Sequence, residues 1–193
     1  MPTSLTMANH FSLRTFQESL AQRLREASAG PAPTSRLGVQ SGGDYWLLRL
    51  DEVGEILPLS DVAGRMAPVP LTKSWYLGVA NVRGNLVGVV DLSLFTSGVP
   101  ASRTAASRLV LVAGRLQAHC ALLVDRMIGL RNLERLQAMD VENTSGGMPV
   151  SWQGAGLRDS NGQAWRELDV TALVADENFL HAGRDGATAG AAA

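Results

Sequence analysis

Short apolar runs separated by turn-forming residues dominate the pattern of hydrophobic and polar positions along this chain. Five runs rich in leucine and valine cover residues 45–50, 77–82, 85–92, 108–114 and 119–125. Glycine or proline interrupts the sequence every few residues between Gly38 and Pro100. Each run is shorter than the roughly ten residues that a helix normally needs. The pattern therefore predicts an all-β body of the barrel or sandwich type.

Two pairs of these runs have the layout of β-hairpins. Arg83, Gly84 and Asn85 separate the runs of the first pair, and Gly84 and Asn85 both tolerate the positive φ angles of a tight hairpin turn. Gly114 and Arg115 separate the runs of the second pair. The similar outline of the two hairpins indicates two related β subdomains, although no sequence repeat connects them.

Helical periodicity appears before the β-rich region. Leu13, Phe16, Leu20 and Leu24 recur at steps of three and four, which predicts an amphipathic helix over residues 11–27. This helix packs either on the body of the protein or on a partner. Small residues and two prolines follow it, so residues 1–35 are interpreted as a helix and its linker.

The C-terminal part is less regular. Residues 141–163 are rich in loop-forming residues, with one short strand expected at 150–152. The pattern of residues 165–174 predicts a strand followed directly by a short helix. Asp169 or Thr171 would cap the start of this helix. Small and polar residues then predict a disordered tail at 181–193, which leaves residues 36–180 as the folded domain.

Composition and charge narrow the function. Apolar residues make up 46% of the chain and charged residues 18%, which is typical of a globular protein. The net charge of -1 favours neither nucleic acid nor an anionic membrane as a partner, and the four tryptophans have no basic stripe beside them. No signal peptide is visible, and no apolar run reaches the ~18 residues of a membrane span. We therefore expect a cytoplasmic protein without direct membrane insertion.

The sequence contains no recognisable catalytic or metal-binding arrangement. His10, His119 and His181 lack the spacing of metal ligands. His119 precedes the single cysteine, Cys120, but neighbours in a strand point to opposite faces, so a Cys–His pair is not expected. Nucleotide-binding glycine loops and the serine-nucleophile motif are absent. We expect no catalytic residue, no cofactor and no metal, which favours a binding module over an enzyme.

Residues 53–92 carry a long ordered motif. It begins as V-x-E-I and continues through a proline-containing stretch to L-G-V-x-N-x-R-G-x-x-x-x-V-x-D-L; its members are Val53, Glu55, Ile56, Leu77, Gly78, Val79, Asn81, Arg83, Gly84, Val89, Asp91 and Leu92. This motif resembles the CheW-like domain family, and the resemblance extends over residues 36–180. Within that family the chain is most similar to the adaptor of the type IV pilus (twitching motility) chemosensory system. Residues 141–162 match the family pattern poorly.

The resemblance implies both a fold and a function. The fold would be two packed five-stranded SH3-like β-barrel subdomains, with an N-terminal amphipathic helix and a short C-terminal helix. The function would be that of a non-enzymatic scaffold adaptor at membrane-bound receptor arrays. One barrel would pair with the regulatory domain of a CheA-type histidine kinase, and a groove between the barrels would accept the cytoplasmic tip of a chemoreceptor. Neither contact needs a cofactor.

Individual residues of this motif can be given roles from the resemblance together with their physical chemistry. Arg83 would be an exposed interface anchor at the hairpin turn, and the alternative is a surface ion pair with Glu55. Val53 and Ile56 would form the apolar floor of the receptor groove on either side of Glu55. Asn81 and Gly84 would shape the turn. Asp91 would cap a strand end rather than contact a partner.

Two other functions compete with the adaptor. The first is a structural component of the array that self-associates through exposed strand edges. The second is a small-ligand-binding β-barrel with enzymatic activity, which would require convergent polar groups that the sequence does not display.

Overall fold

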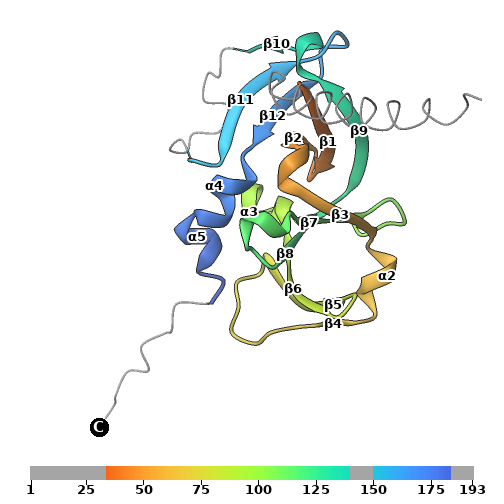
Figure 1. Cartoon of the computed structure of the whole chain (residues 1–193), viewed down its shortest axis with the longest axis vertical. Helices are drawn as coiled ribbons and strands as arrows, with labels where there is room; N and C mark the ends of the chain where they lie inside the picture. The colour runs from red at the N-terminus through yellow and green to blue at the C-terminus, as the bar shows by residue number, and fades with distance from the viewer. Residues whose placement is uncertain (1–33, 140–149, 184–193) are drawn as a thin grey trace, which may run out of the picture. The chain divides into compact units, whose positions relative to one another are not determined.

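The computed structural model of the protein describes residues 34–139 and 150–183, and these residues form two six-stranded β-sheets (Figure 1). Sheet A has the strand order β10-β11-β12-β2-β1-β9 and sheet B the order β3-β7-β8-β6-β5-β4. The strands of sheet A are β1 (Ser35–Ser41), β2 (Asp44–Arg49), β9 (Arg126–Asn132), β10 (Gln137–Ala138), β11 (Gln153–Arg158) and β12 (Ala164–Leu168). Those of sheet B are β3 (Val53–Pro58), β4 (Met66–Ala67), β5 (Tyr76–Val82), β6 (Asn85–Asp91), β7 (Arg108–Val112) and β8 (Cys120–Val124).

The expectation of five strands in each subdomain is wrong by one strand per sheet. The additional strands are β4 and β10, each two residues long. Met66 and Ala67 pair with Ala80 and Val79 at the edge of sheet B. A strand of two residues has no alternation of apolar and polar positions, so the sequence pattern cannot reveal it.

The five apolar runs lie in β2, β5, β6, β7 and β8, as predicted. β5 and β6 form an antiparallel hairpin, and β7 and β8 form another through the 3₁₀ turn η2 (Gly114–Leu116). The positive φ angles of the first turn belong to Arg83 (51°) and Gly84 (88°), whereas Asn85 already begins β6. This two-residue loop with positive φ at both positions matches the right-handed twist of the flanking strands.

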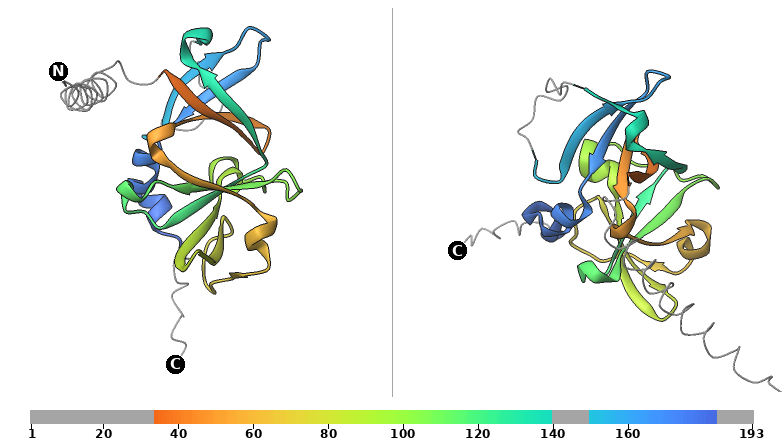
Figure 2. Two further views of the ribbon diagram at one scale, coloured as in Figure 1. Left: turned by 45° about the vertical axis from the view of Figure 1, so that its right-hand side comes forward. Right: turned by 45° about the horizontal axis from the view of Figure 1, so that its top comes forward.

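Each sheet also contains one parallel pair that joins distant segments. β12 pairs in parallel with β2, and β6 pairs in parallel with β8. Sheet A is therefore assembled from both ends of the folded body, while sheet B consists of the continuous segment from Val53 to Val124 (Figure 2). The two sheets are not two consecutive halves of the chain.

Strand β8 contributes to two hydrophobic clusters. Leu122 and Val124 belong to the main cluster, which also contains residues of sheet A such as Trp46. Ala121 and Leu123 belong to a second cluster formed by residues of sheet B and its connections. Successive side chains of a strand point to opposite faces, so both faces of β8 are buried, which explains its uninterrupted apolar sequence.

Four short helices complete the described residues: α2 (Ser60–Ala63), α3 (Leu92–Ser97), α4 (Val170–Ala175) and α5 (Glu177–Leu180). The single predicted C-terminal helix is divided in two, because the carboxylate of Asp176 accepts backbone hydrogen bonds and begins a second helix. Asp169, rather than Thr171, caps α4 by accepting a hydrogen bond from the Ala172 N–H at 2.7 Å. None of the helices in this part of the chain has the length and apolarity to cross a bilayer.

Other boundaries differ from the sequence-based prediction. Residues 151–152 form a turn, and the strand expected at 150–152 begins instead at Gln153. The folded body continues to Gly183, which forms a β-bridge with Thr72. The helix predicted over residues 11–27, its linker and the tail beyond Gly183 lie outside the described residues.

Candidate partner-binding surface

Arg83 and Glu55 lie far apart in the order of sheet B but form an ion pair. Glu55 is on the edge strand β3, and Arg83 is in the turn between β5 and β6. The Nη2 atom of Arg83 lies 2.6 Å from Oε1 of Glu55, and the side chains are 76% and 33% exposed. Three strands separate β3 from β5 in the sheet, so this contact requires sheet B to be strongly curved. The structure thus brings together two of the four predicted partner-binding residues.

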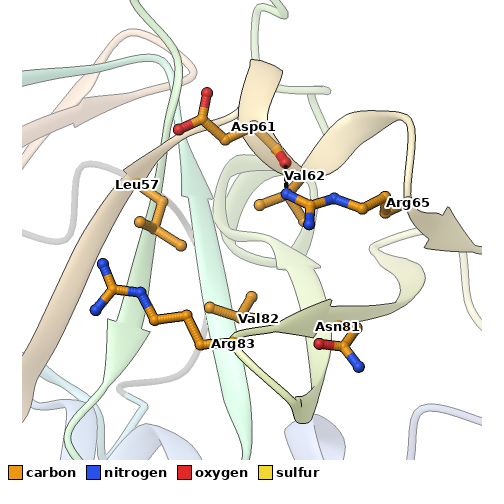
Figure 3. A pocket seen from close by; sticks show the side chains of 7 residues that line it. All are labelled: Leu57, Asp61, Val62, Arg65, Asn81, Val82 and Arg83. Carbon is orange, nitrogen blue, oxygen red and sulfur yellow. Dashed lines mark hydrogen bonds between the residues drawn. The ribbon is translucent and has the colours of Figure 1, made fainter.

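A groove with a volume of about 260 Å³ opens beside this ion pair (Figure 3). Leu57, Val62 and Val82 provide its apolar lining, and polar side chains, including those of Arg65 and Arg83, surround them. The Arg65 guanidinium donates a hydrogen bond to the backbone carbonyl of Asp61, which fixes it beside the groove. Chemically, the groove can accept an aliphatic side chain flanked by polar or charged groups.

Val53 and Ile56 do not line this groove. Both pack partly against the main hydrophobic cluster and pair with Val112 and Val110 of β7. In a regular strand Val53 and Glu55 would share a face, and Ile56 would point the other way. The register shift between Val53 and Ile56 changes this, since the extra residue turns both apolar side chains to the core and Glu55 outward. Leu57, Val62 and Val82 line this groove, and the role of Val53 and Ile56 in a receptor groove stays a prediction.

Two of the predicted turn and structural residues, Asn81 and Gly84, lie at the hairpin loop, and the third, Asp91, lies at the far end of β6. Oδ1 of Asn81 accepts a hydrogen bond from the Gly84 N–H at 2.8 Å. Asp91 is fully buried at the end of β6, where its carboxylate accepts hydrogen bonds from the N–H groups of Leu94, at the start of α3, and Ala101. Asp91 therefore fixes the connection after β6 and has no surface on which to meet a partner.

Glu52 is a buried carboxylate that the sequence analysis did not identify. It lies in the 3₁₀ turn η1 (Leu50–Glu52) and is fully buried. Its carboxylate accepts hydrogen bonds from the N–H groups of Val170 and Thr171 at 3.2 and 3.3 Å, and from the Thr171 hydroxyl at 2.7 Å. These bonds attach the start of α4 to the junction between β2 and β3. Val170 and Thr171 lie more than a hundred residues from Glu52 in the sequence, so no local sequence pattern predicts these hydrogen bonds.

Cys120 and His119 do not form a reactive pair. Both line a second groove of about 250 Å³, but His119 is exposed whereas Cys120 is largely covered. Burial raises the pKa of the Cys120 thiol to about 11, so little of it is thiolate at neutral pH. Within residues 34–139 and 150–183, no group of three or more His, Cys, Asp and Glu side chains is arranged to hold a metal ion.

The thiol of Cys120 is expected to react slowly with Ellman's reagent. With its pKa near 11, the thiolate fraction at pH 8 is about a hundredfold below that of an ordinary cysteine. The rate for the native protein, compared with that of the protein in guanidinium chloride, measures this difference. Equal rates in both conditions would contradict it.

Comparisons with known proteins identify the family and the fold of this chain. The sequence profile described as the CheW-like domain matches residues 36–178. Protein PilI of Pseudomonas aeruginosa is 36% identical over 118 residues, which represent 58% of this chain and 64% of that protein. The chain thus spans somewhat less than two thirds of that relative. The crystal structure of scaffolding protein TtCheW from Thermoanaerobacter tengcongensis matches with a TM-score of 0.55 at 16% identity, over 70% of this chain and 88% of that one. At this low identity, the likeness to TtCheW concerns the fold alone.

Proposed function

The chain belongs to the CheW-like domain family, and from this membership we propose that it couples a chemoreceptor to a CheA-type histidine kinase. As a CheW-like protein it is a non-enzymatic scaffold adaptor in chemosensory signalling. The proposal adds its two partners: the regulatory domain of the kinase and the cytoplasmic tip of the receptor. The protein then works on the cytoplasmic side of membrane-bound receptor arrays and needs no cofactor.

We also propose that this adaptor serves the chemosensory system of type IV pili and twitching motility. The support is the 36% identity to Protein PilI over 118 residues. A deletion of the gene is expected to abolish or reduce twitching zones on agar, and the intact gene should restore them. Normal twitching together with impaired swimming chemotaxis would assign the adaptor to a flagellar system instead.

The observation that best supports a protein-binding role is the conformation of Arg83. A φ of 51° places this arginine in the left-handed region, at a cost of roughly 1 kcal/mol relative to glycine. Its ion pair with Glu55 is exposed, and such pairs contribute only about 0–1 kcal/mol to stability. The pair does little more than offset the strain. We therefore infer that the exposed guanidinium contacts another protein. Arginine is enriched among the residues that anchor protein interfaces.

We expect Arg83→Glu to weaken binding of the kinase regulatory domain at least tenfold, because it places a negative charge where the guanidinium would meet the partner. Titration calorimetry with the regulatory domain of the CheA-type kinase from the same organism measures this. Arg158→Glu makes the same change of charge on β11 of sheet A, and this control is expected to bind as the wild type does.

The charge swap Arg83→Glu with Glu55→Arg separates a structural role from a contact. If the pair only stabilises the curvature of sheet B, the swap restores binding, and the proposed contact is wrong. If Arg83 meets the kinase, the swapped protein folds normally and still binds weakly. A wild-type protein that gives no heat at high micromolar concentrations would refute the kinase proposal and favour the self-associating array component.

A further inference from the structure

The C-terminal latch, as we name residues 177–183, comprises α5 and the three residues that follow it. It leads away from sheet A and reaches the connection between β4 and β5 of sheet B. There the Lys73 N–H donates a hydrogen bond to the Ala182 carbonyl at 2.7 Å. Beside it, Thr72 and Gly183 form an antiparallel β-bridge. The end of the latch is therefore held by backbone pairing with this connection.

A single side chain anchors the latch to the hydrophobic core. Phe179 is 8% exposed, and it is the only buried side chain of the latch. Its ring stacks on Trp75 at a centroid distance of 5.8 Å and meets Phe95 of α3 edge-on at 5.3 Å. Trp75 follows Lys73 by two residues, so the aromatic and the backbone contacts of the latch converge on one short segment.

The helix before the latch is held more firmly. Leu173 of α4 is fully buried, and the carboxylate of Glu52 accepts three hydrogen bonds from the start of that helix. Asp176 separates α4 from α5 with an extended backbone, φ -69° and ψ 131°. A residue at the end of an element can absorb a change of direction, and a segment with few buried apolar contacts opens at a lower free energy than the core. We therefore expect the latch to open about Asp176 while α4 stays in place.

The connection that the latch holds contains a strained residue. Leu71 has a φ of 61°, in the left-handed region, and its side chain is 80% exposed. A backbone in such a conformation persists only where the surrounding contacts hold it. Those contacts are the pairing of Thr72 and Lys73 with the latch and the hydrogen bond from the Thr72 hydroxyl to the Val69 carbonyl at 2.8 Å. Opening of the latch removes the first of them and lets the connection relax.

We propose that the latch is a conformational switch through which the C-terminal end of the chain controls the shape of the connection between β4 and β5. In the closed state, the latch holds residues 72–75. In the open state, it swings about Asp176, Leu71 loses its strain, and the ring face of Trp75 that Phe179 covers becomes accessible. A molecule that binds one of the two states more tightly shifts the equilibrium toward it. Both states belong to the isolated protein, so the switch operates whether or not the proposed partners bind.

The position of Lys73 provides a direct test. It is the only lysine among the 193 residues, so a lysine-specific protease cuts the chain only in the connection that the latch holds. Under native conditions the cleavage rate follows the population of the open state. Phe179→Ala removes the aromatic anchor, and we expect it to speed cleavage of the full-length protein at least about tenfold. Val110→Ala, at a buried residue of β7 in the same hydrophobic cluster, is the control and should leave the rate within about twofold of the wild type.

A cross-link tests the switch in the opposite direction. Thr72→Cys combined with Gly183→Cys places two cysteines opposite each other in an antiparallel bridge, where a disulfide can form. Open space surrounds the position of a side chain at Gly183, and the natural Cys120 is largely covered. We expect the oxidised protein to be cut at least about tenfold more slowly than the same protein after reduction.

Each contrary result overturns the proposal. If Phe179→Ala and Val110→Ala speed cleavage equally, Lys73 becomes accessible only through general unfolding, and the latch has no motion of its own. If the two introduced cysteines do not cross-link, or if the oxidised and reduced proteins are cut at the same rate, the end of the latch does not hold the connection. Neither measurement involves the kinase domain, so a failed kinase titration leaves the switch standing, and an absent switch leaves the proposed adaptor function standing.

Discussion

Replacing Gly78 by alanine is expected to lower the free energy of unfolding by about 3 kcal/mol or more. Gly78 lies near the start of β5 with a φ of 135°, a conformation that side-chain-bearing residues rarely adopt. A Cβ atom built at this position would lie 2.2 Å from the carbonyl oxygen of Ala67 and 2.9 Å from the Cα of Pro68. Both neighbours are backbone atoms that cannot rotate away, so strand β4 would have to move.

Gly84→Ala is the matched control for this prediction. Gly84 also has a positive φ, 88°, but no other atom lies within 4 Å of the position that its Cβ would occupy. Alanine there meets only backbone strain, which costs about 1 kcal/mol. Chemical denaturation followed by tryptophan fluorescence measures both variants. Equal losses of stability at the two positions would show that the close approach of β4 to Gly78 contributes nothing.

Glu52→Ala is expected to destabilise the protein by about 3 kcal/mol, because it leaves three donors of α4 without their acceptor, the one at Val170 in a buried site and the two at Thr171 in a partly buried one. The donors are the N–H groups of Val170 and Thr171 and the hydroxyl of Thr171. Glu52→Gln keeps the size of the side chain and one acceptor oxygen, so we expect a smaller loss, about 1–2 kcal/mol. Hydrogen exchange should locate the effect at the amides of α4 and α5.

The neighbouring acid, Asp51, provides a contrast. It forms exposed ion pairs with Arg49 and Arg115 at 3.1 and 2.7 Å, and about half of its side chain is accessible to solvent. Asp51→Asn is therefore expected to cost less than 1 kcal/mol. If Asp51→Asn and Glu52→Ala destabilise the protein equally, the buried hydrogen bonds of Glu52 are not the cause of its effect.

The sequence predicts those strands of this fold whose signal is local. Leucine and valine runs bounded by glycine and proline identify β2 and β5–β8, and Gly84 identifies the turn of the first hairpin. The two-residue strands β4 and β10 escape prediction, since two residues establish no period. The parallel pairing of β2 with β12 cannot be predicted from the sequence pattern either, because it joins segments more than a hundred residues apart.

The candidate surface was predictable only in part. The motif of the CheW-like family directs attention to Glu55 and Arg83, and the structure brings them within 2.6 Å of each other. The same motif suggested Val53 and Ile56 as the floor of a receptor groove, which stays a prediction; a register shift in β3 turns both side chains partly toward the core. A bulge depends on how a strand meets its neighbour, so a single strand sequence does not specify it. The strain at Arg83 and Leu71 is likewise a property of the folded backbone.

The assembly of sheet A from both ends of the body has a consequence for synthesis on the ribosome. Sheet B is continuous in sequence and can form once residue 124 has emerged, but β2 must wait for β12, which ends at Leu168. At roughly 5–20 residues per second, the edge of β2 that carries Trp46, Leu47 and Leu48 remains uncovered for about ten seconds. A nascent chain with an unpaired apolar strand edge is a substrate for chaperones, and a chain terminated before Ala164 never covers that edge.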